Sequence, residues 1–322
     1  MSYQPIRELV AADLASVDAL MRDRLSSDVP LINQLSSHII GGGGKRLRPV
    51  IVLLSARACG YRSDRHPLLA AIIELIHTAT LLHDDVVDDS QLRRGQTTAN
   101  ARFGNAAAVL VGDFVYSRAF QMMTELHAPR VMTVLAECTN TIAAGEVMQL
   151  MNCRDADATE AQYMEIVYCK TAKLFEAGAR LSAIVAGGAG PIEQGLADYG
   201  KHLGIAFQLI DDVLDYQADS GKTGKNIGDD LAEGKPTLPL IQAMRAGAPQ
   251  QTAAVRSAIE SGGLAQLDAV IEAIESTHTI TYTTERARQQ ARLAVQALDA
   301  LPPSPYRQGL EALAEFLVCR NY

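Results

Sequence analysis

Two clusters of aspartate, each with the spacing Asp-Asp-x-x-Asp, are the residues in this chain best suited to chemistry. One covers residues 84–88 and the other covers residues 211–215. Because residues four apart share one face of a helix, Asp84 and Asp88 are expected to project side by side, and the second cluster repeats this arrangement. Carboxylates held together at the end of an apolar stretch repel one another and lose hydration, unless a cation neutralises them. We therefore interpret the clusters as opposing sides of a divalent-metal site.

Magnesium is the metal that suits such a site best. It takes oxygen ligands, keeps several waters, and normally reaches a protein through one or two carboxylates plus the phosphates of a substrate. The predicted chemistry is therefore that of a diphosphate. A single Asp-Asp-x-x-Asp is weak evidence, because acidic clusters at solvated helix ends are common. Two such clusters, each ending an apolar stretch, are much stronger evidence.

Basic and polar side chains accompany both clusters, as a diphosphate site requires. Arg93 and Arg94 follow the first cluster directly, and His77 lies about two helical turns before Asp84, on the same face. The other groups are Lys45 and Arg48 in a glycine-rich loop, Lys170 with Thr171, Gln208 shortly before the second cluster, and Lys225 beyond it. Taken singly, each has an ordinary explanation, such as a solvated turn, a helix-packing histidine, a surface lysine or a buried glutamine.

Composition favours one helical body. The chain has 322 residues, of which 48% are apolar and 5% aromatic, and it contains no tryptophan. Abundant alanine and leucine are typical of packed helices rather than sheets. We expect a single all-helical domain over residues 1–322. The formal net charge of −8 argues against a nucleic-acid-binding protein, which is usually basic.

Cysteine usage and hydropathy indicate a soluble cytoplasmic protein. The five cysteines are scattered and form no Cys-x-x-Cys motif, which favours reduced thiols. We find no signal peptide and no stretch approaching the ~20 apolar residues that span a bilayer. The protein is still expected to contact a membrane transiently if it releases a hydrophobic product.

Apolar periodicity predicts helices throughout, without the alternation typical of strands. The glycine run Gly41–Gly44 ends a first helical region at residues 5–40. Further helices are expected at residues 50–59, 67–89, 105–126, 130–152, 159–186, 191–217 and 236–246, and through residues 250–322. A polar turn is expected at residues 90–95 and a solvated loop at residues 218–235.

As a set, these motifs resemble the trans-isoprenyl diphosphate synthases, in the same order over roughly residues 30–240. The resemblance rests on the run Gly43-Gly44-Lys45-Arg46-Leu47-Arg48-Pro49, His77, both aspartate clusters, Arg93-Arg94-Gly95, Lys170-Thr171 and Phe207-Gln208. The strings at residues 81–88 and 233–239 look like the long-chain, polyprenyl branch. One departure is the run of four glycines before Lys45, where three are usual, and it leaves the basic loop intact.

The resemblance implies an all-α fold of the isoprenoid-synthase type, a helical bundle around a deep central cavity that works as a homodimer. It implies about three Mg²⁺ ions, bound together with an allylic diphosphate. The metal ligands would be Asp84, Asp88 and Asp211, while Asp85, Asp212 and Asp215 would orient metal-bound water. The allylic diphosphate would also contact Arg93, Lys170, Thr171, Gln208 and Lys225. Isopentenyl diphosphate, which brings no metal, would bind a cationic cradle of Lys45, Arg48, His77 and Arg94.

The implied reaction is head-to-tail prenyl transfer. Charge on the departing diphosphate is stabilised by metal and basic side chains, for which the catalytic residues would be Asp84, Asp85, Asp88, Arg93, Lys170 and Asp211. The double bond of isopentenyl diphosphate then attacks the allylic cation, and holding the two together supplies ~7–11 kcal/mol. The expected starter is farnesyl diphosphate. The expected product is octaprenyl diphosphate for a quinone side chain, with hexa-, hepta-, nona- and decaprenyl products as alternatives.

Product length should depend on side chains about one turn deeper than Asp84. Ala79 and Thr80 are small there, so a growing chain would pass them, although alanine is also common in tightly packed helices. The floor of the tunnel is then expected further down, at Ile76 or near Met123.

Two other functions use similar residues. A terpene cyclase would need the metal carboxylates but not a second diphosphate cradle, which the basic residues argue against. A non-catalytic partner subunit of a related synthase could lose one aspartate cluster, whereas both are intact here.

Overall fold

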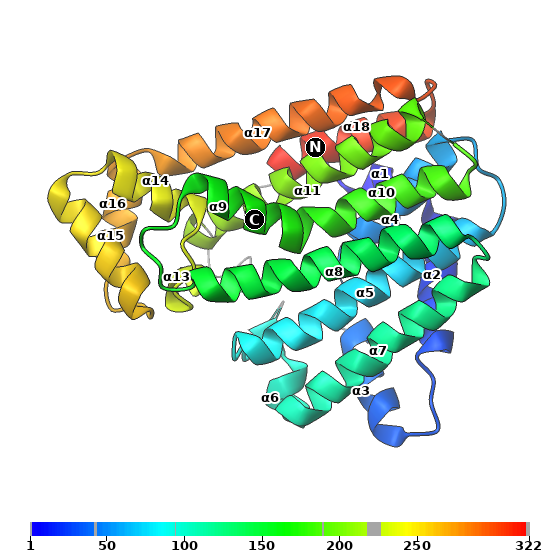
Figure 1. The fold of residues 1–322 in the computed structure, drawn as a ribbon, viewed down its shortest axis with the longest axis horizontal. Coiled ribbons are helices and arrows are strands. Elements are labelled where there is room, and N and C mark those ends of the chain that lie inside the picture. Colours follow the sequence, from blue (N-terminus) through cyan, green and yellow to red (C-terminus); the bar gives the residue numbers. More distant parts are fainter. Residues whose placement is uncertain (1, 42–43, 94, 189, 218–226, 320–322) are drawn as a thin grey trace.

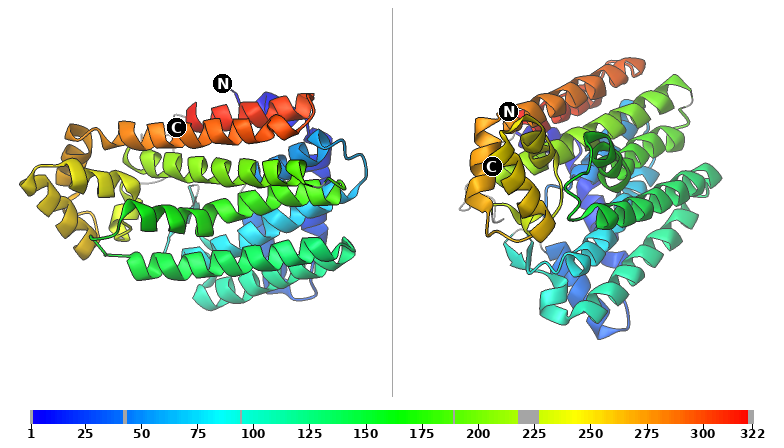
Figure 2. Two further views of the ribbon diagram at one scale, coloured as in Figure 1. Left: turned by 45° about the horizontal axis from the view of Figure 1, so that its top comes forward. Right: turned by 60° about the vertical axis from the view of Figure 1, so that its left-hand side comes forward.

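The protein is an elongated bundle of helices. The computed structural model describes residues 2–41, 44–93, 95–188, 190–217 and 227–319. Figures 1 and 2 show α8 (Pro129–Asn152), α10 (Lys173–Val185), α11 (Pro191–Gln217) and α17 (Thr279–Ala297) lying side by side along the long axis. The all-helical fold expected from composition is therefore confirmed.

The N-terminal region contains three helices where the sequence suggested one continuous helical stretch. They are α1 (Gln4–Glu8), α2 (Ala11–Arg24) and α3 (Pro30–Gly41). Pro30 is the first residue of α3, a position that its fixed φ favours and where its missing N–H has no helical partner to lose. The next helix, α4, covers Leu47–Ala58 and so begins just before Pro49.

The first aspartate cluster ends α5 (Arg65–Val87), and a short hairpin follows it. Strands β1 (Leu92–Arg93) and β2 (Gln96–Thr97) pair antiparallel in a segment that the sequence predicted to be only a polar turn. The prediction missed this pairing because strands of two residues carry no alternation. After the hairpin, α6 (Ala99–Phe103) leads into α7 (Asn105–Glu125).

A π-helical turn interrupts the long helical segment that follows α8. This turn (Val167–Ala172) lies between α9 (Glu160–Ile166) and α10. Two glycines allow the neighbouring helices to press against it. A β-carbon on Gly204 of α11 would lie 2.5 Å from Cα of Ala172, and one on Gly145 of α8 would lie 2.8 Å from the amide nitrogen of Lys170. The turn is therefore clamped between α8 and α11, as π-bulges at functional sites often are.

The remaining helices gather at one end and along the top of the bundle in Figure 1. They are α13 (Asp229–Ala232), α14 (Leu238–Ala246), α15 (Pro249–Ser261), α16 (Leu267–Ser276), α17, a 3₁₀ turn (Leu298–Ala300) and α18 (Pro305–Cys319). Within the predicted loop at 218–235, the described part thus contains the short helix α13. Residues 218–226 lie outside the described residues.

Three groups of buried apolar side chains form the core. The largest joins α2, α4, α5, α7, α8, α10, α11 and α18. A second joins α13, α14, α15 and α16. The third includes Tyr163, Leu209 and Leu238 and connects α9, α11 and α14 behind the second aspartate cluster. The prediction of a single domain stays a prediction.

One described helix, α5, is long and apolar enough to cross a membrane by length and composition. However, 72% of its most apolar window is buried inside the protein, as expected of a core helix. The expectation of no such stretch was therefore too strict, since hydropathy alone does not distinguish the central helix of a bundle from a spanning one.

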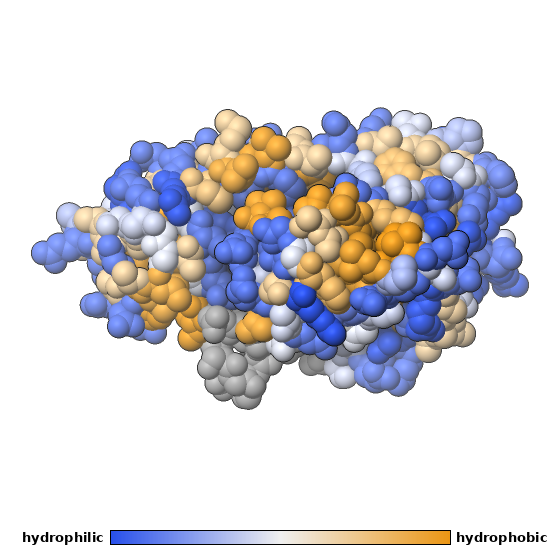
Figure 3. Space-filling view, turned by 90° about the horizontal axis from the view of Figure 1, so that it is seen from below, coloured by the Kyte–Doolittle hydropathy of each residue, from blue (hydrophilic) through white to orange (hydrophobic). Residues whose placement is uncertain are grey.

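Exposed apolar side chains gather on α7 and α8. Leu110 on α7 is 68% exposed, and Leu150 and Met151 on α8 are 63% and 76% exposed. Figure 3 views the face of the molecule on which α7 lies and shows apolar residues gathered there. The expectation of unpaired thiols holds, because all five cysteines lie in the described part of the chain and none forms a disulfide.

Candidate active site

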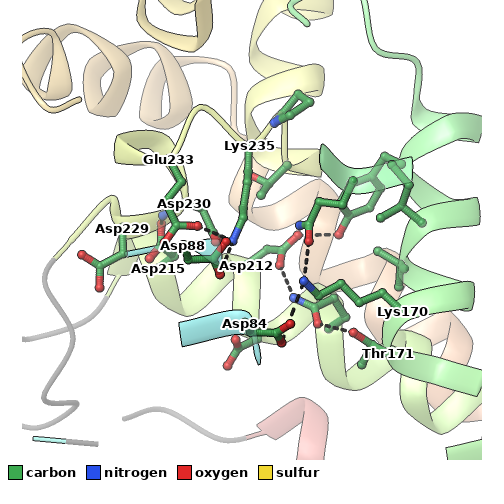
Figure 4. Close-up of a pocket in the computed structure, with 18 of the residues that line it drawn as sticks. Asp84, Asp88, Lys170, Thr171, Asp212, Asp215, Asp229, Asp230, Glu233 and Lys235 are labelled. Atoms are coloured by element: carbon green, nitrogen blue, oxygen red, sulfur yellow. Dashed lines mark hydrogen bonds and ion pairs between the residues drawn. The ribbon is translucent and has the colours of Figure 1, made fainter. Parts of the chain in front are cut away.

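Both aspartate clusters line one cavity of about 250 Å³ at the ends of α5 and α11. Figure 4 shows their side chains facing a shared space, with lysines entering from the π-helical turn and from the segment before α14. The cavity residues expected from the sequence are Asp84, Asp88, Arg93, Lys170, Thr171, Gln208, Asp211, Asp212 and Asp215. The structure thus brings residues from four distant segments together.

Lysines accompany the two aspartates of the first cluster that face the cavity. The Lys235 ammonium lies 3.2 Å from Oδ2 of Asp88, and the Lys170 ammonium lies 4.0 Å from Oδ2 of Asp84. Burial raises the pKa of Asp84, and the negative charge of Asp88 raises it further, whereas Lys170 lowers it. A half-buried carboxylate pair of this kind favours an additional cation.

Asp85, the middle residue of the same cluster, points away from this pair toward the hairpin. Its Oδ1 accepts a hydrogen bond of 2.7 Å from Nε of Arg93 and forms an ion pair with a terminal nitrogen of the same guanidinium at 2.6 Å. Its backbone carbonyl accepts a further bond from the side-chain amide of Asn100 at 2.9 Å. Burial raises the pKa of Asp85, and the Arg93 guanidinium opposes that effect. The hairpin therefore fixes Arg93 at the rim of the cavity.

The middle aspartate of the second cluster, Asp212, is held by neutral donors. Asp212 is almost fully buried, and its carboxylate accepts hydrogen bonds from the Tyr163 hydroxyl and, at 2.8 Å, from the Gln208 side-chain amide. Gln208 in turn accepts a bond of 2.8 Å from the Thr171 hydroxyl. Burial, aided by the charge of Asp230, raises the pKa of Asp212 to about 8, against the effect of the two donors.

The last aspartate of this cluster organises the chain beyond α11. The carboxylate of Asp215 accepts the backbone N–H of Asp230 at 3.3 Å, and its carbonyl accepts that of Gly228 at 3.0 Å. These bonds place α13 beside the cavity, so that Asp229, Asp230 and Glu233 also line it. Asp211 lines the cavity as well.

The π-helical turn presents Lys170 and Thr171 to the cavity. Lys170 also contacts Glu146 on α8, at 2.5 Å, and the side-chain oxygen of Gln149. Burial raises the pKa of Glu146, and the nearby Asp84 raises it further. Lys170 is therefore shared among three acidic or polar groups from α5 and α8.

The donor set fits a hard divalent cation. The carboxylates of Asp84, Asp88 and Asp211 supply only oxygen, the ligand type that Mg²⁺ and Ca²⁺ prefer. In the described residues no three His, Cys, Asp or Glu side chains already converge as a metal site, and Lys170 and Lys235 lie among the carboxylates instead. The raised pKa of Asp84 shows that the site favours added positive charge.

The basic residues of the predicted isopentenyl cradle lie outside the residues that line this cavity. The Lys45 ammonium lies 5.9 Å from the centre of the Phe316 ring, and the Arg48 guanidinium lies 4.5 Å from that of Phe175. His77 is half-buried on α5, two turns before Asp84. Arg94 and Lys225 fall outside the described residues.

The residues predicted to set product length lie inside the bundle. Ile76, Ala79 and Met123 are each 0% exposed and belong to the largest core cluster, and none of them lines the cavity. The Thr80 hydroxyl donates to the backbone carbonyl of His77 at 2.9 Å. Their role in product length stays a prediction.

Sequence reasoning missed several polar residues at the site, including Asp229, Asp230 and Glu233, which line the cavity. Tyr163 holds Asp212, and Glu146 and Gln149 hold Lys170. The only available signal was weak: Glu146 and Gln149 are polar residues three apart, on one face of an otherwise apolar helix end. Tyr163 gave no signal, because its partner is distant in sequence.

Comparison with known proteins identifies the family. Residues 29–276 match the family model described as polyprenyl synthetase. The chain is 55% identical to the octaprenyl diphosphate synthase of Escherichia coli, over all of both chains. It superposes with a TM-score of 0.96 on a polyprenyl synthase of Caulobacter crescentus solved with calcium and isoprenyl diphosphate, at 43% identity over 99% of this chain and 98% of that one.

A second solved structure agrees. A decaprenyl diphosphate synthase of Rhodobacter capsulatus gives a TM-score of 0.93 and 42% identity over 98% of each chain. These likenesses cover whole chains, and the family match covers more than half of this one, so they extend well beyond the aspartate motifs. The chain belongs to the polyprenyl synthetase family.

Proposed function

We propose that this protein is a metal-dependent trans-prenyltransferase that adds isopentenyl diphosphate to an allylic diphosphate and makes a long-chain polyprenyl diphosphate, octaprenyl diphosphate in particular. The observation that carries the proposal is the single cavity in which two aspartate clusters face Lys170, Thr171, Gln208 and Lys235. The likeness to the Escherichia coli octaprenyl enzyme over the full chain supports the product. A cyclase or a non-catalytic subunit is not favoured, because the matches are to synthases along the whole chain.

The cavity is built to hold a diphosphate and to stabilise it as it departs. Lys170 and Arg93 supply positive charge to the cavity, while Thr171 and Gln208 supply neutral polar groups. Charges fixed in advance by the hairpin and the π-helical turn need no reorganisation when the carbon–oxygen bond breaks. The buried apolar helices beside the cavity exclude water, which would otherwise capture an allylic cation.

Asp84, Asp88 and Asp211 would hold the divalent metal, which we propose is Mg²⁺, about three ions arriving with the diphosphate. When bound, the metal would neutralise charge on the departing diphosphate. Before it binds, Lys170 and Lys235 partly neutralise these carboxylates. Asp85 and Asp212, each held by hydrogen bonds, would keep the flanking carboxylates and their waters in place.

Lys45, Arg48, His77 and Arg94 would hold isopentenyl diphosphate beside the cavity. His77 lies on the same helix as Asp84, so α5 connects this cradle to the first aspartate cluster. The nucleophilic double bond would then lie close to the allylic carbon, and proximity would lower the barrier by ~7–11 kcal/mol.

Product length would be limited inside the core along α5. Replacing Ala79 with Tyr should block the path one turn below Asp84 and shift the products to much shorter chains, as seen by chromatography of the dephosphorylated lipids. Ala79→Ser, whose side chain is close in size to that of alanine, should leave the distribution of product lengths unchanged. If the tyrosine variant folds and still makes the long product, Ala79 does not line the path.

We further propose that the exposed apolar surface on α7 and α8 is the interface of a homodimer. Leu110, Leu150 and Met151 together expose more apolar side chain than single surface residues normally do. Sedimentation should give twice the chain mass for the wild type, and Leu110→Glu should shift the equilibrium toward the monomer. A wild-type protein that sediments as a monomer would refute this.

We also propose a cytoplasmic location, with transient membrane contact during product release.

The direct test is to incubate the purified chain with Mg²⁺, farnesyl diphosphate and labelled isopentenyl diphosphate, and to size the lipid product. We expect incorporation of several isopentenyl units, a requirement for both substrates, and loss of activity with a chelator. Release of a cyclic hydrocarbon without isopentenyl diphosphate would instead identify a cyclase. Absence of activity unless a second protein is added would indicate a partner subunit.

A further inference from the structure

Arg46 lies between two of the residues proposed to bind isopentenyl diphosphate, and its backbone is unusual. It precedes α4 with φ 53° and ψ 39°, in the left-handed region that residues with a β-carbon rarely adopt. Lys45 comes directly before it, and Arg48 lies in the first turn of α4. Such a conformation persists only where surrounding contacts hold it, and these conformations are concentrated at functional sites.

The Arg46 side chain turns into the protein and is held by acidic groups. One terminal nitrogen lies 2.9 Å from Oε1 of Glu74, and Nε lies 3.4 Å from Oδ1 of Asp18. The side chains of Arg46 and Glu74 are only 12% and 9% exposed. Because its guanidinium is engaged by two carboxylates, Arg46 acts on the protein and not on a substrate, unlike the role proposed for its basic neighbours.

Glu74 connects this loop to the catalytic helix. It lies on α5, three residues before His77 and ten before Asp84, or about 15 Å along the helix from Asp84. A continuous α-helix of this kind is a rigid spacer. The ion pair therefore ties the loop that carries Lys45 and Arg48 to the same element that carries the first aspartate cluster.

A second set of contacts holds the other side of the loop. The Tyr3 hydroxyl donates a hydrogen bond of 2.7 Å to the backbone carbonyl of Lys45. The Tyr3 ring stacks on Phe316 of α18, with centroids 5.4 Å apart, and the Lys45 ammonium lies 5.9 Å from the same Phe316 ring. The Lys45 backbone is thus held by Tyr3, and the Arg46 side chain is held by the carboxylates described above.

We propose that Arg46, through Glu74, is a positioning residue that sets the distance between the isopentenyl diphosphate cradle and the aspartate clusters. This inference rests on the function proposed above, in which Lys45 and Arg48 bind isopentenyl diphosphate. The geometry makes Arg46 specific to that substrate, because its partners Glu74 and Asp18 lie on α5 and α2, and neither lines the aspartate cavity.

The test is steady-state kinetics of Glu74→Gln and Arg46→Met with each substrate varied in turn. Both variants should raise KM for isopentenyl diphosphate about 10- to 100-fold, the cost of a misplacement on the order of 1 Å, with little change in KM for the allylic diphosphate. Arg46→Lys keeps the charge but loses the planar guanidinium. Its KM for isopentenyl diphosphate should therefore lie between those of Arg46→Met and the wild type. Because the two residues contact each other, the double variant should have a KM for isopentenyl diphosphate no higher than that of the more impaired single variant.

Arg57→Met is the matched control. Arg57 lies at the opposite end of α4 and makes a part-buried pair with Asp13, with contacts of 2.8 and 2.9 Å. Its loss should lower the melting temperature without changing the ratio of the two KM values. If Arg46→Met fails to fold, the isosteric Glu74→Gln variant still decides the question, by calorimetric titration of the folded protein with isopentenyl diphosphate.

The outcomes separate this inference from the proposed function. If the wild type does not consume isopentenyl diphosphate, the proposed function is wrong, and the positioning role that rests on it is wrong as well. If Lys45→Ala raises KM for isopentenyl diphosphate but Glu74→Gln and Arg46→Met do not, the function stands and the positioning role is wrong. Equal increases in both KM values for the Glu74 and Arg46 variants would also overturn it, because they would indicate a general structural effect.

Discussion

The two aspartate clusters have the same spacing, but their middle residues, Asp85 and Asp212, are held in opposite ways. In the first, on α5, every carboxylate has a cationic neighbour: Lys170 near Asp84, Arg93 on Asp85 and Lys235 on Asp88. In the second, on α11, Asp212 is held by the neutral donors Tyr163 and Gln208. The middle aspartate of the motif is therefore charge-paired in the first cluster and held by neutral donors in the second.

The difference shows how a site can hold acidic groups close together before a metal arrives. In the first cluster, Lys170 and Arg93 lower the pKa values of Asp84 and Asp85, although burial raises both by more. Neutral donors fix the geometry of Asp212 without supplying a positive charge, so that its pKa rises to about 8. Asp85 is thus held by a charged partner, and Asp212 is held by neutral hydrogen-bond donors.

The largest expected effect comes from the carboxylates that face the cavity. Asp84→Ala should lower condensation activity by about 1,000-fold or more, because it removes a metal ligand and with it the stabilisation of the departing diphosphate. The fold should survive, since the buried carboxylate is not a source of stability. Asp211→Ala should behave alike, which would show that both clusters serve one metal site. Asp89→Asn, which changes an exposed neighbouring residue, is the control. If Asp84→Ala kept normal activity and normal Mg²⁺ dependence, Asp84 would not be a metal ligand.

Breaking the charge pair of the first cluster should cost the most stability. Arg93→Met leaves the buried Asp85 carboxylate without its partner, which should reduce the free energy of unfolding by roughly 3 kcal/mol at neutral pH. Urea unfolding of the metal-free protein measures this. The double variant with Asp85→Asn should recover much of the loss. A single variant as stable as the wild type would mean that the hairpin, and not the ion pair, holds this cluster.

Removing the neutral donor of the second cluster should have a smaller effect. Tyr163→Phe deletes one hydrogen bond to a buried carboxyl and nothing else, so the free energy of unfolding should fall by about 1–2 kcal/mol. Activity should fall as well, because Asp212 loses its orientation. Tyr282→Phe, which removes a hydroxyl bonded to Glu160 away from the cavity, is the control. Equal losses for Arg93→Met and Tyr163→Phe would contradict the distinction between the two clusters.

The pH dependence of stability tests the setting of Asp212 separately. Because the folded-state pKa of Asp212 is about 8 and that of an unfolded aspartate is about 3.9, the folded protein retains a proton that the unfolded chain releases between these values. Stability should therefore decline as pH rises from about 4 to 8. Asp212→Asn should reduce that decline by about 1–3 kcal/mol between pH 5 and 8. Urea unfolding at both pH values, with a chelator present, checks this, and an unchanged decline would mean that Asp212 titrates normally.

Helices were largely predictable from the chain, and the places where prediction failed have local causes. Long apolar stretches with helical spacing, such as α5, α8 and α11, lie within a few residues of their expected bounds. The first helical region divides at Pro30, and the hairpin after Asp88 is too short to show alternation. The π-helical turn at Lys170 was not foreseeable either, because it depends on close contacts with Gly145 and Gly204.

The sequence alone determined which groups could do chemistry. Spacing within one helix fixes which aspartates share a face, and residue type fixes which side chains can bind metal or phosphate, so both follow from local geometry. Only the tertiary structure decided how each carboxylate is neutralised. That depends on partners such as Tyr163 on α9 and Lys235 in the segment before α14, which are distant in sequence from the clusters and reach them only through packing.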